Sequence, residues 1–377
     1  MLSISSLYFI LICALSLLNH CTSLPPLINS FQTKTFSFLS NDTNSTNFVI
    51  SPLSLYQALS LLSNGARGST EYEIINSINH NNLVDQNIYN FKMLNTTRSS
   101  VVLANAVLSK FTPTDSFIQI SNRFKAFISE LTSVEQVNQW CYNKTNGTIP
   151  SIIDSIDNAV LIILNAVYFQ NEWKHKFNSQ MTYTSTFTNI NNTTSNVNMM
   201  KQLNVFNYYE DSNVQVIELE YKYDNISAII ILPQNEININ TYINNNFNET
   251  TLQMYCHNFT KQEIEIHLPK FTVESHLNLN NVLKQVGIKR PFNNTAADFK
   301  LISPHGNLYI SSIIQRTVIK VNEEGTEAAS VTAVVLDGAL MPQVHIKKVV
   351  VNRPFIFMIK DNVFTKNYAF IAKVVNL

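Results

Sequence analysis

The spacing of apolar residues along the chain predicts helices in its first part and strands in much of the rest. Apolar residues recur at helical spacing from Leu27 to Leu39 and from Ser51 to Leu62. The dipeptide Ser51-Pro52 is typical of a helix start, because proline fits the first helical turn. Both segments are therefore predicted to be amphipathic or buried helices.

Three more helices follow from start and stop signals. Thr70 is followed three residues later by Glu73, which is the pattern of a capping box, so one helix should begin near Ser69 or Thr70. The other two predicted helices are Val134 to Asn143 and Leu277 to Val286, the second ended by Gly287.

Runs of β-branched and aromatic residues have the length of strands. They are Val160 to Phe169, Val216 to Tyr221, Ser227 to Leu232, Glu263 to Leu268, Ile313 to Val321, Val344 to Val351, Phe355 to Ile359 and Ala369 to Val375. Helices that come early and strands that come late, without regular alternation, indicate an α+β fold with mixed or antiparallel sheets.

Charge and glycine content exclude several classes of function. The chain carries 26 basic and 26 acidic side chains, so it has no net field that would attract nucleic acid or an anionic membrane. Its seven glycines complete no nucleotide-binding loop, and the G-x-S-x-G elbow of many hydrolases is absent. Hydrophobic residues make up 45% of the chain, which is enough for a packed core and excludes disorder.

The N-terminus has the pattern of a secretory signal peptide. Leu7 to Leu18 is a nearly unbroken apolar run that is too short to span a bilayer, and Cys21 and Ser23 stand at the spacing that a signal peptidase recognises. We predict cleavage before Leu24, so that residues 1–23 are the signal peptide and the protein is secreted. A retained anchor is the alternative, because the first six residues contain no Lys or Arg.

The rest of the chain, residues 24–377, is predicted to be one domain. Its length would suit two domains, but no linker, charge block or internal repeat divides it. Eleven N-x-S/T sequons agree with secretion, although a chain this rich in Asn acquires some by chance, and the sequence does not say which are glycosylated. The sequons begin at Asn41, Asn44, Asn95, Asn143, Asn146, Asn191, Asn192, Asn225, Asn248, Asn258 and Asn293.

Cysteine and histidine spacing indicates neither a disulfide framework nor a metal site. Cys141 and Cys256 are the only cysteines after the signal, and we expect free, buried thiols while their pairing stays open. No two histidines are three or four residues apart, and no C-x-x-C occurs. A Ser-His-Asp triad has no fixed spacing, so an enzyme stays an alternative, but we expect no catalysis and no cofactor.

Seven segments of the chain form an ordered set: FVISPLSLYQALSLLSNGARGST (Phe48–Thr70), VNQWCYNKTNGTI (Val137–Ile149), LNAVYFQNEWKHKF (Leu164–Phe177), VNMM (Val197–Met200), HLPKFTVES (His267–Ser275), VNEEGTEAAS (Val321–Ser330) and NRPFIFMI (Asn352–Ile359). Together with the C-terminal FIAKVVNL, these segments resemble the serpin family, and the similarity covers nearly the whole mature chain.

The resemblance implies three β-sheets, about nine helices and an exposed reactive loop near the C-terminus, at about residues 323–346. In serpins this loop is bait for a protease, whose nucleophile attacks it and forms an acyl-enzyme. The cut loop then enters the large sheet as a new strand, and the protease is carried away and distorted before it can be released.

The resemblance places the hinge of the loop at Glu323, Glu324, Gly325, Thr326, Glu327, Ala328, Ala329 and Ser330. From Thr326 to Leu336 there is no Pro, no Gly and a single charge, Glu327. Because strand side chains alternate between two faces, one face of this segment carries only small or β-branched neutral residues and could be buried in a sheet. These residues are Thr326, Ala328, Ser330, Thr332 and Val334.

Four residues match the cluster that controls sheet opening in the family: Ser51, Ser54, Asn165 and Gln315. Gln315 departs from the family, because many members have His there, although Gln keeps both a donor and an acceptor. A second departure is Val331, where inhibitory members usually have a smaller residue. The segment between Leu103 and Trp140 also looks shortened, so its edge strand should be missing or brief.

Counting seventeen residues from Glu323, as the family implies, places the attacked carbonyl on Ala339, with Leu340 after it. The loop looks longer than usual, so Leu340 and Leu336 are the next candidates. Trypsin-like enzymes need Lys or Arg, and neither occurs between Lys320 and Lys347. The resemblance and the sequence together imply a monomeric inhibitor of an elastase-like or chymotrypsin-like serine protease.

Two further expectations complete the interpretation. Family members that heparin activates carry basic clusters, whereas Ile74 to Asn95 contains only Lys92, so we expect no response to heparin. The alternative to an inhibitor is a non-inhibitory serpin that acts as a carrier or chaperone-like binding protein. The strand-compatible segment from Thr326 to Leu336 favours inhibition.

Overall fold

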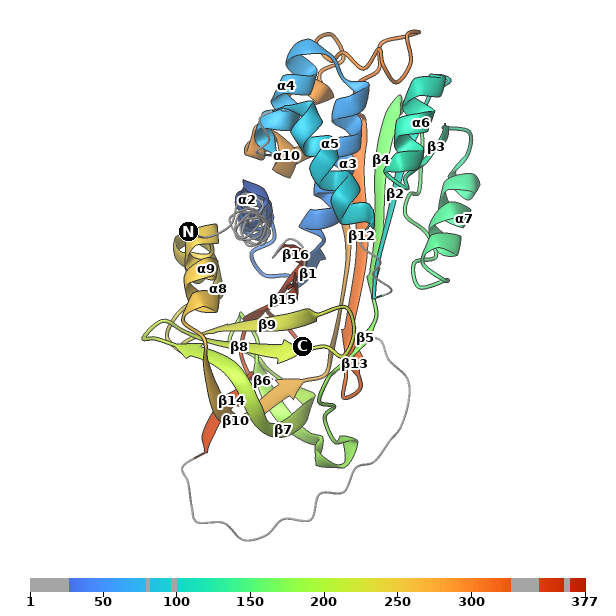
Figure 1. The fold of residues 1–377 in the computed structure, drawn as a ribbon. Helices are drawn as coiled ribbons and strands as arrows, with labels where there is room; N and C mark the ends of the chain where they lie inside the picture. Colours follow the sequence, from blue (N-terminus) through green and yellow to red (C-terminus); the bar gives the residue numbers. More distant parts are fainter. Residues whose placement is uncertain (1–26, 79–81, 96–99, 327–345, 363–366) are drawn as a thin grey trace, which may run out of the picture.

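The computed structural model describes residues 27–78, 82–95, 100–326, 346–362 and 367–377. Helices gather at one end of the molecule and a strongly twisted sheet forms the other end, while the long strands of a second sheet run between them (Figure 1). The predicted signal peptide, the hinge residues Glu327, Ala328, Ala329 and Ser330, and the predicted scissile bond between Ala339 and Leu340 lie outside the described residues.

Nine α-helices are present in the described part of the chain, in agreement with the expected number. They are α2 (Leu27–Asp42), α3 (Pro52–Gly65), α4 (Gly68–Ser77), α5 (Leu83–Asn95), α6 (Asp115–Arg123), α7 (Val134–Lys144), α8 (Ile239–Asn246), α9 (Glu249–His257) and α10 (Asn280–Val286).

Helix α3 occupies the centre of the helical end, and nearly all of its residues are buried. Apolar side chains surround the helix, so it packs on the sheet strands β2, β4 and β16 as well as on α2, α4, α5 and α6. The predicted start is confirmed: Pro52 is in the first turn, and the Ser51 hydroxyl accepts a hydrogen bond from the Ser54 N–H at 3.3 Å.

The long sheet has the strand order β3-β2-β4-β12-β13-β5, and β11 pairs with β12. Its strands are β2 (Val101–Ser109), β3 (Phe127–Glu130), β4 (Leu161–Phe169), β5 (Asn171–Glu172), β11 (Phe271–Asn278), β12 (Ser312–Val321) and β13 (Gly325–Thr326). The central pair, β4 and β12, is parallel, whereas β2 is antiparallel to β4 and β11 is antiparallel to β12.

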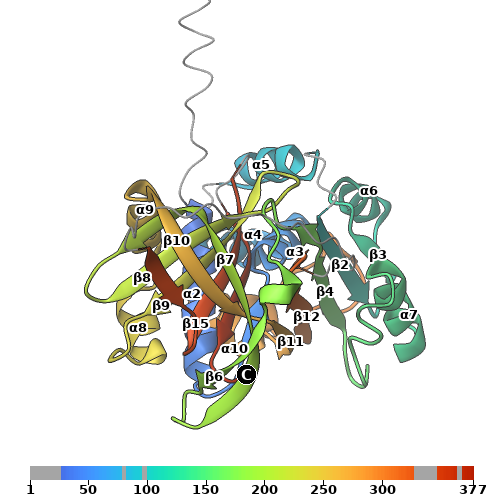
Figure 2. The same cartoon turned by 90° about the horizontal axis from the view of Figure 1, so that it is seen from below.

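The other sheet has the order β1-β16-β15-β9-β8-β7-β10-β14, and β6 pairs with β7. Its strands are β1 (Phe48–Ile50), β6 (Tyr183–Thr188), β7 (Thr194–Glu210), β8 (Val214–Glu220), β9 (Ile226–Pro233), β10 (Thr260–Pro269), β14 (Lys347–Val350), β15 (Phe355–Asp361) and β16 (Tyr368–Val374). Seen from below, β7 and β10 cross the face of the molecule side by side (Figure 2).

Strand β7 explains why the three expected sheets form two hydrogen-bonded networks. It is 17 residues long and pairs with β6 and β10 over most of its length, then with β8 through its last residues. Two of the expected sheets therefore share this strand. Its many Asn residues have low strand propensity, which is why the sequence pattern did not predict it.

Two helix predictions need correction. The predicted capping box is wrong, because α4 begins at Gly68 and its N-cap residue makes no side-chain capping bond. Thr70 instead accepts a hydrogen bond from the Asp298 N–H at 3.0 Å, and Glu73 accepts from the backbone N–H groups of Lys289 and Arg290. Helix α10 begins at Asn280 rather than Leu277, because Leu277 belongs to β11.

The expected shortening is visible at the edge of the long sheet. Edge strand β3 has four residues and pairs in parallel with β2. Strand β2 itself was not predicted, although it is an apolar run of strand length. Edge strand β3 is therefore brief rather than missing.

Candidate functional site

The chain reverses direction directly after β12, through a turn at Asn322–Gly325. The Asn322 N–H donates to the Gly325 carbonyl at 2.9 Å, and Asn322 Oδ1 accepts from the N–H groups of Glu324 and Gly325 at 3.0 and 3.2 Å. Strand β13 then runs antiparallel to β12, with Val321 opposite Thr326. The turn therefore sends the following residues back along β12.

Gly325 is required by the close approach of two backbones. In β13, Gly325 lies opposite Glu172 and Thr326 lies opposite Asn171 of β5. A Cβ atom on Gly325 would lie 2.1 Å from the Asn171 carbonyl oxygen, a distance at which one of the two strands must move. Only glycine allows β13 to pair with β5 in this position.

The two glutamates of the turn are bound by separate cations. The Glu323 carboxylate accepts a hydrogen bond from Thr182 at 2.8 Å and pairs with Lys270 at 2.9 Å, and Glu324 pairs with Lys176 at 2.6 Å. Burial opposes ionisation of Glu323, but the hydrogen bonds outweigh it, and the pKa of its carboxyl is lowered. Both side chains attach the turn to the chain around residues 176–182 and to Lys270.

Trp173 holds the same turn from the opposite side. Its Nε1 donates to the Asn322 carbonyl and its backbone N–H donates to the Glu324 carbonyl, both at 2.9 Å. The buried indole ring stacks on Tyr221 with ring centres 4.4 Å apart. We did not predict this residue from the sequence. The available signal was that the chain has two tryptophans and both lie in segments of the resemblance.

Thr326 is the last described residue before the predicted loop, and it faces the interior. Its side chain is fully buried, and its hydroxyl lies 2.7 Å from the hydroxyl of Tyr221. The side-chain face that carries Thr326 therefore points into the core of the molecule.

Strand β13 stands at the end of the contact between β4 and β12, which we call the β4–β12 seam. The two strands pair in parallel as far as Val318 and Tyr168. Beyond that point β13 lies between β12 and β5, and β5 follows β4 along the chain after Gln170 (Figure 1). The first residues of the hinge thus already occupy the mouth of the seam.

The four residues predicted to control sheet opening lie together in the middle of the seam, and all are buried. Gln315 lies opposite Asn165 in the parallel register. Gln315 Oε1 accepts from the Ser51 N–H at 2.6 Å, and its Nε2 donates to the Ser51 carbonyl at 3.0 Å. Gln315 therefore ties β12 to the start of α3 through both of its polar groups.

Asn105 of β2 connects the remaining members and was missed by the sequence analysis. Its Oδ1 accepts from the Ser54 hydroxyl at 2.8 Å and from Asn165 Nδ2 at 2.6 Å. A single Asn in the apolar run from Val101 to Leu108 was the available signal, because a buried amide needs partners. Asn165 Oδ1 is buried and has no hydrogen-bond partner among the described residues.

The strand that follows the predicted loop, β14, is attached to β10 by charge as well as by pairing. Glu265 lies opposite Lys348 and pairs with it at 3.3 Å, with Lys201 at 2.9 Å and with His267 at 2.9 Å. Burial opposes ionisation of Glu265, but these bonds outweigh it and lower the pKa of the carboxyl to about 2. Both ends of the predicted loop are therefore held by glutamate–lysine pairs.

Other candidate chemistry is limited in the described part of the protein. Cys141 and Cys256 are not joined in a disulfide; Cys141 is buried as expected, and burial raises the pKa of its thiol to about 12, whereas Cys256 is half-buried. No group of three His, Cys, Asp or Glu side chains could hold a metal ion within residues that the structure describes. None of the described helices is long and apolar enough to cross a membrane.

The structure is thus an α+β fold in which β4 and β12 pair in parallel and β13 turns back at the end of that pair. The profile of the family described as "Serpin (serine protease inhibitor)" matches residues 26–377. An uncharacterized serpin-like protein of Methanosarcina acetivorans is 32% identical over 371 residues, covering 92% of this chain and 84% of the relative. The human leukocyte elastase inhibitor is 30% identical, covering 87% of this chain and 92% of the inhibitor.

Solved structures agree with these relatives. The thermophilic serpin Tengpin in its native state has a TM-score of 0.84 at 30% identity, with 93% of each chain covered. Native protease nexin-1 with heparin has a TM-score of 0.82 at 26% identity, covering 93% of this chain and 98% of that chain. Thyroxine-binding globulin with thyroxine also has a TM-score of 0.82, but at 23% identity it supports the fold alone.

The chain belongs to the serpin family. The family is one of protease inhibitors rather than enzymes. The turn at Asn322–Gly325 and the buried polar cluster of the β4–β12 seam contain the residues that match the hinge and the sheet-opening cluster of the family.

Replacing Gly325 with Ala should displace β13 from β5, because the new Cβ meets backbone atoms that cannot rotate away. We expect a loss of about 1–3 kcal/mol, seen as a melting midpoint several degrees lower by circular dichroism. Gly68→Ala is the control, since Gly68 also has a positive φ, of 55°, but no atom lies within 4 Å of its added Cβ. Equal losses of stability in the two variants would show that the close approach of β13 and β5 is not the cause.

Glu265 should make the protein less stable in acid. Because its folded-state pKa of about 2 lies below the ordinary value of 4.5, its contribution is complete above about pH 4.5 and is lost as the pH falls toward 2. Glu265→Gln should cost about 1–3 kcal/mol at pH 7 and flatten the pH dependence of the melting midpoint in that window. Glu263→Gln, an exposed residue on the same strand, is the control, and an equal effect there would refute this prediction.

Proposed function

We propose that this protein is a secreted serine protease inhibitor that acts as a suicide substrate. The observation that carries the proposal is the position of β13 between β12 and β5, at the mouth of the β4–β12 seam. A chain that enters there and continues would run antiparallel to both β4 and β12. The insertion would replace one parallel ladder with two antiparallel ladders, which pair slightly more strongly per residue.

The register of β13 predicts where each inserted residue would go. Thr326 lies opposite Val321 of β12 and Asn171 of β5. Continuing that register one residue at a time along both neighbours brings Thr332 between Gln315 and Asn165. The register with β12 and the register with β5 both place Thr332 at this position, which supports insertion along the β4–β12 seam.

Thr332 is chemically suited to that position. It would share the buried face of Thr326, because the two residues are an even number of positions apart. Asn165 Oδ1 is a buried acceptor without a partner in the described structure, and a threonine hydroxyl could donate to it. Since a buried unsatisfied acceptor costs roughly 1–3 kcal/mol, insertion would remove a penalty that the uninserted state carries.

The length of the seam also matches the sequence of the loop. The same register brings Leu336 opposite Leu161, the first residue of β4. Leu336 is the last residue before a second charge, Asp337, and a glycine, Gly338. The strand-compatible segment therefore ends where the seam ends.

The inhibitory step begins as ordinary proteolysis. The protease serine oxygen attacks the carbonyl carbon of Ala339, the peptide bond to Leu340 breaks, and Leu340 leaves with a new amino group. The acyl-enzyme is then carried along the sheet as the loop inserts. With no Lys or Arg between Lys320 and Lys347, the target is an elastase-like or chymotrypsin-like enzyme.

The other parts of the proposal rest on the sequence. The signal-peptide pattern predicted for residues 1–23 supports secretion, and neutral overall charge gives no support for binding nucleic acid or a membrane. We also propose a monomer whose inhibition heparin does not accelerate, because Ile74 to Asn95 contains a single Lys.

A carrier or chaperone-like serpin is the second candidate. Thyroxine-binding globulin, which has the same fold, was solved with thyroxine, so the fold by itself is compatible with a binding function. Such a function needs no strand insertion, so the behaviour of the cut loop separates the two candidates.

Cleavage in the loop should stabilise the protein. If the segment after Thr326 inserts, limited proteolysis by an elastase-like enzyme should raise the melting midpoint by tens of degrees, because a central strand completes the sheet. The same enzyme at equal concentration should give a complex that survives SDS. An unchanged midpoint together with no stable complex would leave the carrier function standing.

A charge on the buried face should block insertion, whereas the same charge on the opposite face should not. Ala328→Arg should raise the number of inhibitor molecules consumed per protease by at least about tenfold, because an unpaired buried charge costs several kcal/mol. Ala329→Arg is the matched control and should inhibit like the parent protein. Similar effects of the two substitutions would show that the face assignment is wrong.

The scissile bond can be read from the fragment that is released. Mass spectrometry of the C-terminal peptide should find a new N-terminus at Leu340. A new N-terminus at Met341 or Asp337 would correspond to the next candidates, Leu340 and Leu336. A new N-terminus at Lys348 would instead mean cleavage after Lys347, and the proposed protease specificity would be wrong.

A further inference from the structure

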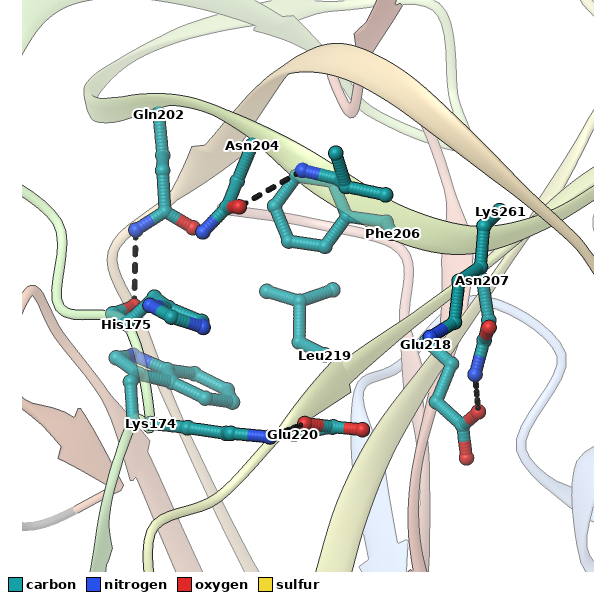
Figure 3. Close-up of a pocket in the computed structure, with 12 residues that line it drawn as sticks. Lys174, His175, Gln202, Asn204, Phe206, Asn207, Glu218, Leu219, Glu220 and Lys261 are labelled. Carbon is teal, nitrogen blue, oxygen red and sulfur yellow. Dashed lines mark hydrogen bonds and ion pairs between the residues drawn. The ribbon is translucent and has the colours of Figure 1, made fainter.

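A cavity of about 260 Å³ lies beside the turn at Asn322–Gly325, between the segment after β5 and strands β7, β8 and β10. We call it the Trp173 cavity. Its floor is apolar, because Trp173, Phe206 and Leu219 line it and each is at least nine-tenths buried. Figure 3 shows Leu219 in the middle of the cavity, with polar side chains around the rim.

The acidic groups on the rim already have partners. Glu220 forms an ion pair with Lys174. Glu218 accepts hydrogen bonds from Asn207 Nδ2 at 2.8 Å and from the Ser227 hydroxyl at 2.6 Å. Both oxygens of Glu218 therefore already accept hydrogen bonds, and Lys174 compensates the charge of Glu220.

One basic side chain on the rim, Lys261, forms no ion pair within the described part of the chain. Lys261 of β10 lines the cavity, is exposed, and has no acidic partner among the residues that the structure describes. The close-up shows Lys261 on the side opposite His175, with Asn204 and Gln202 above the apolar floor (Figure 3). The cavity thus combines a flat apolar floor, amide groups and one unpaired cation, which suits an anionic ligand with an aromatic body.

The size of the cavity sets the size of the ligand. A dry cavity of about 150 Å³ holds benzene in another protein, so the larger space here would accommodate one ring and a short chain. A carboxylate at the end of that chain would reach the rim and pair with Lys261, while the ring would lie against Trp173 and Leu219.

The walls of the cavity are the same segments that hold the hinge. Trp173 donates two hydrogen bonds to the turn, and Lys176 pairs with Glu324. Gln202, on the rim, donates from Nε2 to the carbonyls of His175 and Lys176, both at 2.8 Å. A ligand that fills the cavity would therefore fix the segment 173–177 against β7 and, through it, the turn.

We propose that the Trp173 cavity binds a small aromatic carboxylate and that binding holds the turn at Asn322–Gly325 in the position seen here. Such a ligand stabilises the conformation that it binds. A movement of the turn that disrupts the cavity would cost the binding free energy that is lost. The proposal concerns a ligand site and does not require the loop to insert, so it can fail or succeed independently of the proposed inhibition.

The binding test uses 4-phenylbutyrate as the probe and its uncharged analogue 4-phenylbutanamide as the comparison. Trp140→Phe leaves Trp173 as the single tryptophan, so its fluorescence reports on the cavity. We expect saturable binding of the acid, about fivefold tighter than the amide, from pairing with one exposed lysine. Equal affinities for the two compounds, or no saturable change in Trp173 fluorescence, would overturn the proposal.

Variants test whether Lys261 causes the preference for the acid over the amide. In the Trp140→Phe background, Lys261→Ala should remove the preference for the acid and leave binding of the amide unchanged, and Lys261→Arg should keep the preference. Lys300→Ala changes an exposed lysine outside the cavity and serves as the control. Loss of the preference in Lys300→Ala, or its persistence in Lys261→Ala, would show that the site is elsewhere.

Hydrogen exchange tests the link to the hinge. Saturating 4-phenylbutyrate should slow exchange of the amides of residues 173–177 and 322–325 by at least about threefold, with the amides of α7 unchanged as an internal reference. Slower exchange confined to β7 and β8 would show that the ligand binds without holding the turn, and the second half of the proposal would be wrong.

Discussion

The parallel contact between β4 and β12 is the constraint on which the rest of the structure depends. Two buried strands meet there, and the polar side chains of Gln315 and Asn165 lie opposite each other in the seam. Each amide is bound to a neighbouring element rather than to the other amide, Gln315 to Ser51 and Asn165 to Asn105. The seam is thus closed by backbone pairing and bridged from behind, because Ser51 and Ser54 belong to the same helix start and bind Gln315 and Asn105.

The buried polar cluster links the two sides of the seam through the start of α3. Buried polar groups are costly to expose without partners, so moving β4 and β12 apart requires the bonds of Gln315 to Ser51, or of Asn105 to Ser54, to break or to move with α3. The segment that precedes the loop and the strand that follows it are held at the same time, by Lys176 and Lys270 at the turn and by Lys201 and Lys348 at β14. The structure therefore holds the chain on both sides of residues 327–345.

Much of the candidate site could be recognised from the sequence, because its residues stand in long, ordered segments of resemblance. Ser51, Ser54, Asn165 and Gln315 lie together as that resemblance implied. Asn105 was missed, because a single polar residue in an apolar strand does not indicate which distant residues it will bind. The capping box at Thr70 and Glu73 was wrong, because both side chains bind the distant residues 289–298 instead of their own helix.

The sequence by itself determined that the segment from Thr326 to Leu336 can become a buried strand, since side-chain size, charge and the absence of Pro and Gly are local properties. Only the tertiary structure decided where that strand would lie. Register depends on the partner strands, and these are β12 and the remote β5, whose backbone approaches so closely that Gly325 is required. Local pattern sets what a segment can become, whereas the packing of distant segments sets which partners it meets.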